Sequence, residues 1–421
     1  MSVSSSATDV ANNEDLLSQI LVRLPPKSLL CFKSVSKQWL SLISSPQFIV
    51  THILCRGSAS PSGLLLNNDY LHTPEFHYVP LTHSNPSQTS PPYLSYLGAP
   101  RIKILQSCNG LLLCSSAYQK NDPNYELKYF DDFTQTEDDV LLPDIWHVIP
   151  TISNSCIQTR IHYSGFRFYV CNPTTKQFNT LSFPFFQYHI LALNLAFDPL
   201  HSPYYKILCI LKKNLDTFII HLYNSETKTW NPSSVSFNAP WEISFREPVF
   251  CRRAIHWYSD RQTSLYYDVD KECLNPMPMP PSSTYGTVNY FGESGGHLHL
   301  IMSYVLELDV FELQKDYSAW SVRYHINLEA IRVSLYGMCG FSSNEFIASV
   351  LRITRGEKEE ESEAVVFMFG VEGIMVVSYN LSDGTHRRHT GLVPSRGDVH
   401  DFKLLHSYRD TFPFIETLSP I

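Results

Sequence analysis

Apolar side chains recur at helical spacing near the start of the chain, in three short runs. The first run follows Asn13, a good N-cap residue, and carries Glu14 and Asp15 in its first turn, where acidic groups face the positive end of a helix. The prolines at 25–26 end this helix, and the second of them can open the next one. The apolar positions are Leu16, Leu17, Ile20, Leu21, Leu24, Leu29, Leu30, Phe32, Val35, Trp39, Leu42 and Ile43. The pattern predicts three short helices, the last of which ends near Pro46.

Beyond Thr51 the pattern changes to short alternating or continuous apolar runs broken by Gly, Pro, Asn and Asp, which indicates strands and turns. One unit recurs, in which a strand is followed by a polar turn and then by an aromatic residue or leucine. Most copies are roughly 40–50 residues apart, a period that is typical of the blades of a β-propeller. The last interval is longer because it contains an acidic insertion at 357–363, which predicts a solvated loop. The copies are anchored at Asn172, Asn224, Asp268, Glu312 and Asn380.

Two further stretches extend the repeats to about six blades. Residues 63–81 contain another strand pattern, and residues 402–406 could close the ring. A β-sandwich, or an irregular β fold with coincidental hairpins, is the alternative. The expected fold class is mainly β with a small α-helical N-terminal module, that is, a three-helix head followed by a propeller-like repeat domain.

The composition supports a mostly β chain and argues against several classes of function. The 24 Tyr, 25 Phe and 6 Trp favour strands, and the 27 prolines suit turns better than helix interiors. The formal net charge of −8 gives no indication of a basic surface that would bind nucleic acid. We expect no secretory signal in the polar start and no membrane span, because no run of 18 apolar residues occurs. The ten cysteines form no CxxC pair, so we expect reduced, mostly buried thiols in the cytoplasm and/or nucleus.

The helical head carries more apolar surface than a bundle of about 40 residues can cover by itself. Each Leu or Phe left in water forgoes roughly 1.5–3 kcal/mol of burial. Leu16, Leu17, Leu29, Leu30 and Trp39 therefore predict docking against another surface. On the residues alone, that surface could belong to a second protein or to the β body of the same chain.

The segment from Glu14 to Phe48, EDLLSQILVRLPPKSLLCFKSVSKQWLSLISSPQF, closely resembles the F-box. The LPPKSLL run, the Lys37-x-Trp39 step and the Pro46-x-Phe48 ending agree with the family in order and spacing. The agreement is specific, because many independent positions match over an uninterrupted segment.

The chain departs from the family pattern in three places. Asn12 and Asn13 stand where Leu-Pro usually precedes the first helix, Cys31 replaces a common Arg, and Ser36 replaces a common Cys. The missing Leu-Pro removes part of the usual adaptor contact but leaves the helical face. The resemblance implies that this face docks on a Skp-type adaptor. Its residues would be Leu16, Leu17, Ile20, Leu21, Leu24, Pro25, Leu29, Leu30, Val35 and Trp39.

The β body carries SCNGLLLCSS at Ser107–Ser116, the CNPTTKQF turn around Asn172, and LAFDPLHSPYYKILCI at Leu195–Ile210. In these motifs it resembles the F-box-associated domain of plant F-box proteins. The likeness covers most of the chain but is loose, because the turn motif is generic. The implied domains are a disordered N-terminus at 1–11, an F-box at 12–50, and an F-box-associated, propeller-like substrate-binding domain at 51–421.

Two constellations could carry chemistry, and the sequence favours a structural interpretation of both. The GESGG stretch at Gly292–Gly296 fits the G-x-S-x-G pattern of hydrolases, but the residues after it alternate as a strand rather than a helix, so we predict a hairpin turn. His297 and His299 share one face of that strand, and no third metal ligand is suggested nearby. No phosphate-binding loop or dinucleotide motif occurs. We expect no catalytic residue, no cofactor and no metal.

Together the resemblances imply a non-catalytic substrate receptor. The F-box would dock on the Skp-type adaptor, and through it on a cullin ligase of the SCF type, while the β-repeat domain would bind an unidentified protein for ubiquitination. One alternative is an adaptor-bound interaction module that acts outside a ligase, and another is a propeller enzyme with its site in the central funnel. Exposed loops are the default substrate contacts, and the candidates are 85–100 and 118–143.

Overall fold

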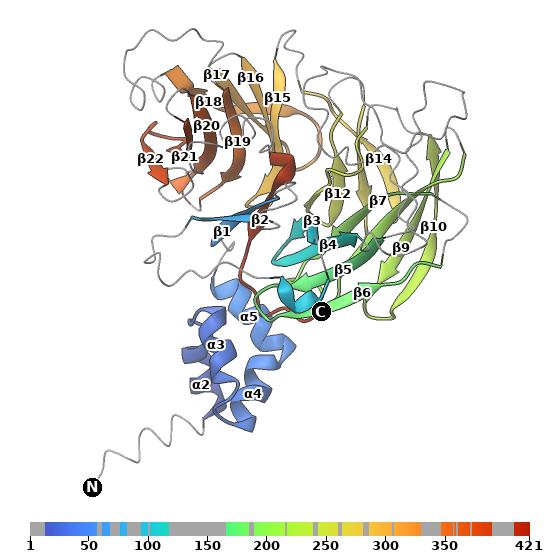
Figure 1. Cartoon of the computed structure of the whole chain (residues 1–421), viewed down its shortest axis with the longest axis vertical. Helices are drawn as coiled ribbons and strands as arrows, with labels where there is room; N and C mark the ends of the chain where they lie inside the picture. Colours follow the sequence, from blue (N-terminus) through green and yellow to red (C-terminus); the bar gives the residue numbers. More distant parts are fainter. Residues whose placement is uncertain are drawn as a thin grey trace.

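The chain has a helical head at its start and a β body whose sheets are arranged around a centre (Figure 1). The predicted disordered N-terminus at 1–11 lies outside the described residues. No helix in the described part is long and apolar enough to cross a membrane. The computed structural model describes residues 13–56, 61–67, 76–81, 94–99, 102–117, 166–184, 189–214, 217–238, 243–259, 263–280, 286–304, 307–329, 347–356, 358, 361–370, 373–389 and 408–421.

Four helices form the part of the head that the structure describes. Asn13 caps the first, because its side-chain oxygen accepts hydrogen bonds from the backbone N–H groups of Asp15 and Leu16, both at 3.1 Å. Pro26 opens the second helix as its first residue, as the sequence predicts. The helices are α2 (Glu14–Leu21), α3 (Pro26–Phe32), α4 (Lys37–Ser44) and α5 (Pro46–Cys55).

The fourth helix corrects the sequence prediction of three. The sequence pattern places a helix end at the Ser-Ser-Pro stretch, whereas the structure begins a new helix there. The Ser45 side chain accepts a hydrogen bond from the backbone N–H of Phe48 at 3.2 Å, and Pro46 is the first helical residue. Here the serine caps the new helix and the proline is its first residue, so a Ser-Pro pair can begin a helix as well as end one. Consequently the helical region continues past Thr51 to Cys55.

Six antiparallel sheets form a six-bladed β-propeller (Figure 1), which confirms the predicted fold class. Five blades have four strands in chain order. Blade 1 has β3 (Ile102–Cys108), β4 (Leu111–Ala117), β5 (Phe166–Asn172) and β6 (Gln177–Leu181), and blade 2 has β7 (His189–Ala196), β8 (Lys206–Lys212), β9 (Thr217–Asn224) and β10 (Thr229–Asn238). Blade 3 has β11 (Val249–Cys251), β12 (Ala254–Trp257), β13 (Ser264–Asp268) and β14 (Cys273–Met277), and blade 4 has β15 (Thr287–Ser294), β16 (His297–Tyr304), β17 (Glu307–Leu313) and β18 (Trp320–Asn327). Blade 5 has β19 (Ile347–Thr354), β20 (Glu363–Gly370), β21 (Gly373–Asn380) and β22 (His386–His389).

The sixth blade joins the two ends of the β body. Strand β1 (Gly63–Asn67) pairs with β2 (Phe76–Pro80) on one side and with β23 (Thr411–Phe414) on the other, so that Gly63 lies opposite Phe414. The blade predicted within 63–81 is therefore present. Strand β23 pairs with β1 in this blade, and residues 402–406, which were predicted to close the ring, lie outside the described residues. The closing strand has only four residues, too few for its alternation to be detected in the sequence.

The recurring anchors mark the hairpin between the third and fourth strands of each four-stranded blade. In four of them the anchor side chain accepts a hydrogen bond from the backbone N–H two residues later, at 2.8–3.0 Å. The fourth predicted copy is different. Strand β17 ends at Leu313, so the predicted anchor Glu312 is the residue before the strand end rather than the strand end itself. In this hairpin the side chain of Asp316 accepts the hydrogen bond, from the backbone N–H of Ser318. The four regular anchors are Asn172, Asn224, Asp268 and Asn380.

The strand order gives the propeller two different ends. The first strands of neighbouring blades contact one another, for example β3 with β7 and β15 with β19, so they form the inner ring. Because the strands are antiparallel, the hairpins between strands one and two and between strands three and four lie at one end, which we call the hairpin end. The other connections lie at the opposite end, the loop end. The head joins at the hairpin end, where α5 leads toward Gly63 of β1.

The interior contains buried thiols and imidazoles. The eight cysteines that the structure describes are free, and five of them are buried, in line with the sequence expectation.

His256 links blade 3 to blade 4, because its Nδ1 lies 3.1 Å from the carbonyl oxygen of Val249 and its Nε2 lies 2.7 Å from the Tyr317 hydroxyl. The carbonyl can only accept, so Nδ1 donates and Nε2 accepts from Tyr317, which is the neutral imidazole. Burial lowers the pKa of both His256 and His299 to about 4.

These two histidines should make the propeller lose stability as the pH falls from about 6.5, the ordinary histidine pKa, to about 4. In that window the unfolded chain binds protons that the folded chain excludes, so the free energy of unfolding decreases with decreasing pH. Each histidine contributes on the order of 3 kcal/mol over the full window. Urea denaturation of the full chain at pH 7 and pH 4.5 would measure this, and His256→Gln should flatten the dependence. His201 is exposed, so His201→Gln is the matched control. An unchanged dependence in His256→Gln would contradict the prediction.

Candidate docking surface and axial channel

The helical head encloses a small core of its own. Leu17, Leu21 and Leu29 are 3%, 1% and 0% exposed, and they lie in one cluster with Ile43 and Phe48. Three of the ten predicted docking residues are thus placed inside the head rather than on its surface. Helical spacing could not separate them from their neighbours, because the leucines of α2 form one broad apolar stripe.

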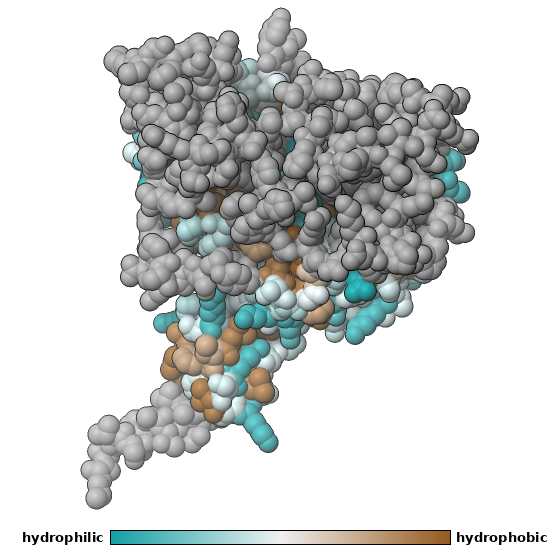
Figure 2. Space-filling view, in the orientation of Figure 1, coloured by the Kyte–Doolittle hydropathy of each residue, from teal (hydrophilic) through white to brown (hydrophobic). Residues whose placement is uncertain are grey.

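Other predicted docking residues are open to solvent. Leu16, Ile20 and Val35 are 42%, 52% and 58% exposed. Leu16 and Ile20 are four residues apart on α2 and share one face, and Val35 lies in the turn between α3 and α4. Leu40 of α4 is also 47% exposed, although the sequence analysis did not single it out. Figure 2 shows apolar side chains gathered on the visible face of the head, beneath the β body.

The remaining predicted residues lie between these extremes. Pro25 is exposed, while Leu24, Leu30 and Trp39 are partly buried against the head core. The Trp39 ring meets Phe32 edge to face, with 5.6 Å between ring centroids. We call the accessible members the head surface, and that they bind an adaptor stays a prediction. The head surface consists of Leu16, Ile20, Leu24, Pro25, Leu30, Val35 and Trp39.

The C-terminal tail, residues 415–421, covers another part of the head. Leu418 is 3% exposed and belongs to the same cluster as Leu17 and Phe48. The Nζ of Lys27 lies 2.9 Å from Glu416, although the lysine is 45% exposed and such a surface pair contributes little. The head therefore packs on its own chain at this tail, while Leu16, Ile20 and Val35 of the head surface remain exposed.

The same tail is fixed to blade 1. The Asn172 side-chain amide donates to the carbonyl oxygens of Thr417 and Ser419 at 3.2 and 2.8 Å, and the N–H of Thr417 donates to Thr174 Oγ1 at 3.2 Å. Gly110 has a φ of +91°, and a Cβ there would lie 2.5 Å from Thr417 Cγ2, so only glycine fits this turn. The tail thus connects the head core to blade 1, and Figure 1 shows the C-terminus beside both.

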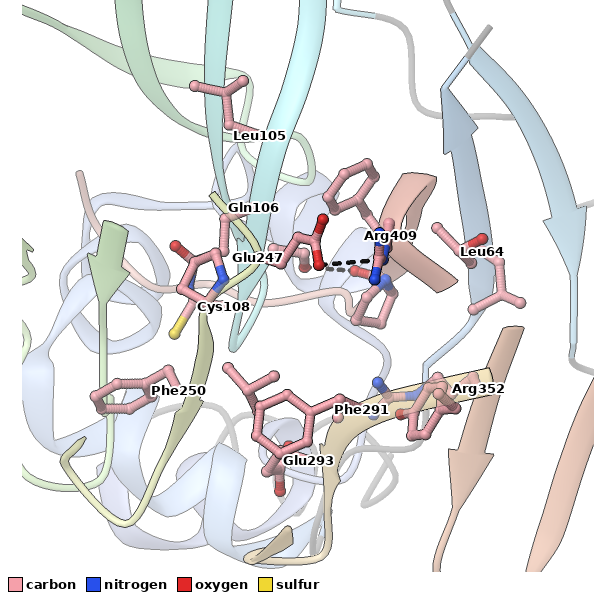
Figure 3. Close-up of a pocket in the computed structure, with 18 of the residues that line it drawn as sticks. Leu64, Leu105, Gln106, Cys108, Glu247, Phe250, Phe291, Glu293, Arg352 and Arg409 are labelled. Atoms are coloured by element: carbon pink, nitrogen blue, oxygen red, sulfur yellow. Dashed lines mark hydrogen bonds and ion pairs between the residues drawn. The ribbon is translucent and has the colours of Figure 1, made fainter. Parts of the chain in front are cut away.

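A cavity of about 130 Å³ lies on the propeller axis (Figure 3). Its walls come from blades 1, 3, 4, 5 and 6, and include the aromatic rings of Phe250, Phe291 and Phe412. We call this cavity the axial channel. The charged residues that line it, among those that the structure describes, are Arg246, Glu247, Glu293, Arg352 and Arg409.

The charges in the axial channel are unevenly paired. Glu247 Oε2 lies 3.1 Å from Arg409 Nε, and burial raises the pKa of the Glu247 carboxyl while Arg409 opposes that shift. Glu293 Oε1 accepts a hydrogen bond from Gly296 N at 2.9 Å, in the β15–β16 turn at the hairpin end. Arg352 forms no ion pair with any residue in the described part of the chain, and its Nε is buried without a hydrogen-bond partner there.

The GESGG stretch forms a turn, and His297 and His299 lie on the strand that follows it. Gly295 and Gly296 have φ values of 59° and 75° and turn the chain from β15 to β16, which confirms the hairpin interpretation of GESGG. Ser294 is 4% exposed, and its Oγ accepts a hydrogen bond from Arg355 N at 2.7 Å. His297 Nδ1 lies 2.9 Å from Glu312, and His299 is 1% exposed. Over the described ranges, no three His, Cys, Asp or Glu side chains are grouped as metal ligands.

The candidate substrate loops are largely outside the described residues. Residues 118–143 lie wholly outside them, and of 85–100 only 94–99 are described, including the short helix η1 (Ser95–Leu97). Their role in substrate binding stays a prediction.

The F-box domain family matches residues 13–51. F-box protein At5g07610 of Arabidopsis thaliana is 30% identical to this chain, over 99% of this chain and 94% of that protein. F-box protein At5g49610 of the same plant is 22% identical, over 86% of this chain and 91% of that protein.

Solved structures are less similar. TolB from Acinetobacter baumannii aligns with a TM-score of 0.32 and 11% sequence identity, covering 55% of this chain and 49% of TolB. A likeness of this size bears on neither function nor mechanism.

Proposed function

This chain belongs to the F-box protein family, and from that membership we propose that it is the substrate-recognition subunit of an SCF-type ubiquitin ligase. The head docks on a Skp-type adaptor, and through it on a cullin. The propeller binds the protein that is to be ubiquitinated, and the chain itself performs no chemistry.

Two exposed aliphatic side chains of the head are the main support for this proposal. Leu16 and Ile20 leave about half of their surface in water on one face of α2. Burying such a side chain completely stabilises a complex by roughly 1.5–3 kcal/mol. Because about half of each side chain is open to solvent, a partner has access to them.

The fold suggests how docking would serve ubiquitination. The tail is held by both the head core and blade 1, so it restricts the orientation of the propeller relative to the adaptor. A substrate bound at the loop end would then be held at a limited range of distances from the ubiquitin-conjugating enzyme. The ligase acts by raising the effective concentration of a substrate lysine.

We also extend the proposed F-box from 12–50 to Cys55, because α5 is continuous to that residue. The propeller-like substrate-binding domain then begins with β1 at Gly63. We propose that the assembly acts in the cytoplasm and/or nucleus, where cullin ligases meet their substrates.

The proposal is tested by reconstituting the complex. The full chain, mixed with a Skp-type adaptor and a cullin, should elute from size-exclusion chromatography as one ternary complex, because the adaptor bridges the other two. A chain that binds the adaptor but excludes the cullin would refute the ligase role and favour an interaction module outside a ligase. A chain that binds neither would refute docking by the head.

A further inference from the structure

We propose that Asn172, on blade 1, controls how tightly the head binds its adaptor, because it holds the tail in the position in which Leu418 completes the head core. Asn172 is a positioning residue, since it lies in the propeller and acts through the tail. The inference rests on the proposed function and adds a form of regulation to it. Adaptor binding depends on whether the tail is seated between head and propeller or released from them.

Asn172 differs from the other regular anchors in its burial. It is 0% exposed, whereas Asn224, Asp268 and Asn380 are partly exposed. In all four turns a side-chain oxygen accepts the backbone hydrogen bond, and Asp268 shows that a carboxylate is sufficient for this. The turn of blade 1 therefore does not require the side-chain amide of Asn172, which donates to the tail instead.

The tail is seated by contacts on two sides. On the propeller side, the Asn172 amide donates to the carbonyl oxygens of Thr417 and Ser419, and Ile421 packs against the core shared by blades 1 and 2. On the head side, Leu418 is 3% exposed within the head core. The two hydrogen bonds of Asn172 thus fix the backbone on either side of the leucine that enters the head.

The head core connects Leu418 to the proposed docking face. Leu17 and Leu21, on the inner face of α2, lie in the same cluster as Leu418. Leu16 and Ile20, on the outer face of α2, are exposed toward the proposed adaptor. Release of the tail removes Leu418 from this core, and a helix of only eight residues has little stability of its own. The adaptor then has to order α2 as it binds, which lowers its affinity.

The seated and released positions of the tail are the two states of this device. Strand β23 ends at Phe414, four residues before Leu418, so a released tail stays close to its site and can return to it. An adaptor that prefers the seated state must also hold the tail in place, because coupling between two sites is reciprocal. Any event at blade 1 that breaks the hydrogen bonds of Asn172 therefore weakens adaptor binding without altering the docking face.

Asn172→Asp tests the proposal, because it keeps the oxygen that forms the turn and removes the amide that holds the tail. Titration of the full chain with purified Skp-type adaptor should show an affinity at least about fivefold lower than that of the wild type, the lower end of the range for coupled sites. Wild-type affinity in this variant would overturn the proposal.

Asn224→Asp is the matched control. It makes the same change in the corresponding turn of blade 2, which forms no hydrogen bond with the tail in the described part of the chain. This variant should bind the adaptor as the wild type does. An equal loss of affinity in Asn224→Asp would show that the effect is a general one of blade turns, which contradicts the role of the tail.

A double-variant cycle places both residues in one device. Leu418→Ala should also weaken adaptor binding, and its combination with Asn172→Asp should weaken it little further, because either single change already unseats the tail. Fully additive losses would mean that Asn172 acts independently of Leu418, and the proposal would fall.

The wild-type chain provides a test that does not depend on the folding of a variant. Saturating adaptor should slow hydrogen exchange in the tail, where the N–H of Thr417 is bonded to Thr174 Oγ1. The blade 2 turn at 224–228 should exchange equally with and without adaptor. Unchanged exchange of residues 415–421 on adaptor binding would overturn the coupling.

Failure of this proposal is distinguishable from failure of the proposed function. Equal adaptor affinity of the wild type and Asn172→Asp overturns the role of Asn172 but leaves the substrate receptor intact. A wild-type chain that binds no adaptor overturns the proposed function. Hydrogen exchange of residues 13–56 without adaptor then decides whether Asn172 seats the tail: faster exchange in Asn172→Asp supports this role, and equal exchange overturns it.

Discussion

A full-length chain carrying both Leu16→Asp and Ile20→Asp should bind a Skp-type adaptor about 10²–10⁴-fold more weakly than the wild type. The two side chains are 42% and 52% exposed on one face of α2, so the proposed complex buries both of them. Each fully buried leucine or isoleucine contributes roughly 1.5–3 kcal/mol, and a carboxylate in its place adds a desolvation cost. Isothermal titration calorimetry with purified adaptor measures the loss.

The folded state should not change, because substitutions at exposed positions usually alter stability by less than about 0.5 kcal/mol. Leu200→Asp is the matched control, since Leu200 is 51% exposed but belongs to the propeller. That variant should bind the adaptor as the wild type does. Full adaptor affinity in the double variant would mean that α2 does not take part in docking.

Leu418→Ala should lower the free energy of unfolding of the head by about 2–5 kcal/mol, the range for removing a buried leucine side chain from a core. Leu418 is 3% exposed among the core residues of the head, and Leu418→Asp should destabilise the head further because it buries an unpaired charge. Hydrogen exchange followed by mass spectrometry should show faster exchange in residues 13–56, with little change in blades 2 to 5.

Pro420 provides the control for that result. It lies two residues further along the same tail and is exposed, so Pro420→Asp should exchange as the wild type does. Unaltered protection of the head in Leu418→Asp would show that the tail contact contributes nothing to its stability.

The sequence predicted the architecture well because its signals were local. Asn13 caps α2 as expected, and four of the five anchors form the same side-chain to backbone turn. Such turns depend on residues only a few positions apart, so a single sequence contains the information needed to recognise them.

The features that the sequence did not predict depend on context. Ser45 and Pro46 can stop one helix or start another, and only the packing of α5 against α4 decides between them. The closing strand β23 is defined by its partner β1, more than three hundred residues earlier in the chain. No local pattern records such a pairing.

The ten predicted docking residues show that single side chains are also decided by context. Leu29 and Leu30 are neighbours in sequence, but Leu29 is 0% exposed and Leu30 only partly buried. A substitution at Leu29 would therefore test the stability of the head rather than its binding. Arg352 and Leu418 were not recognised from sequence, because a lone arginine in a strand and a leucine near the chain end carry no periodic signal.

The tail also makes packing of the head depend on a residue that is synthesised after all six blades. Leu418 is made only after every blade, and it then enters the core of helices that were synthesised first. Nascent chains and products of premature stop codons lack this leucine, so their heads are incompletely packed. Only chains that extend through Leu418 would have a fully packed head, so shorter chains should bind the proposed adaptor more weakly.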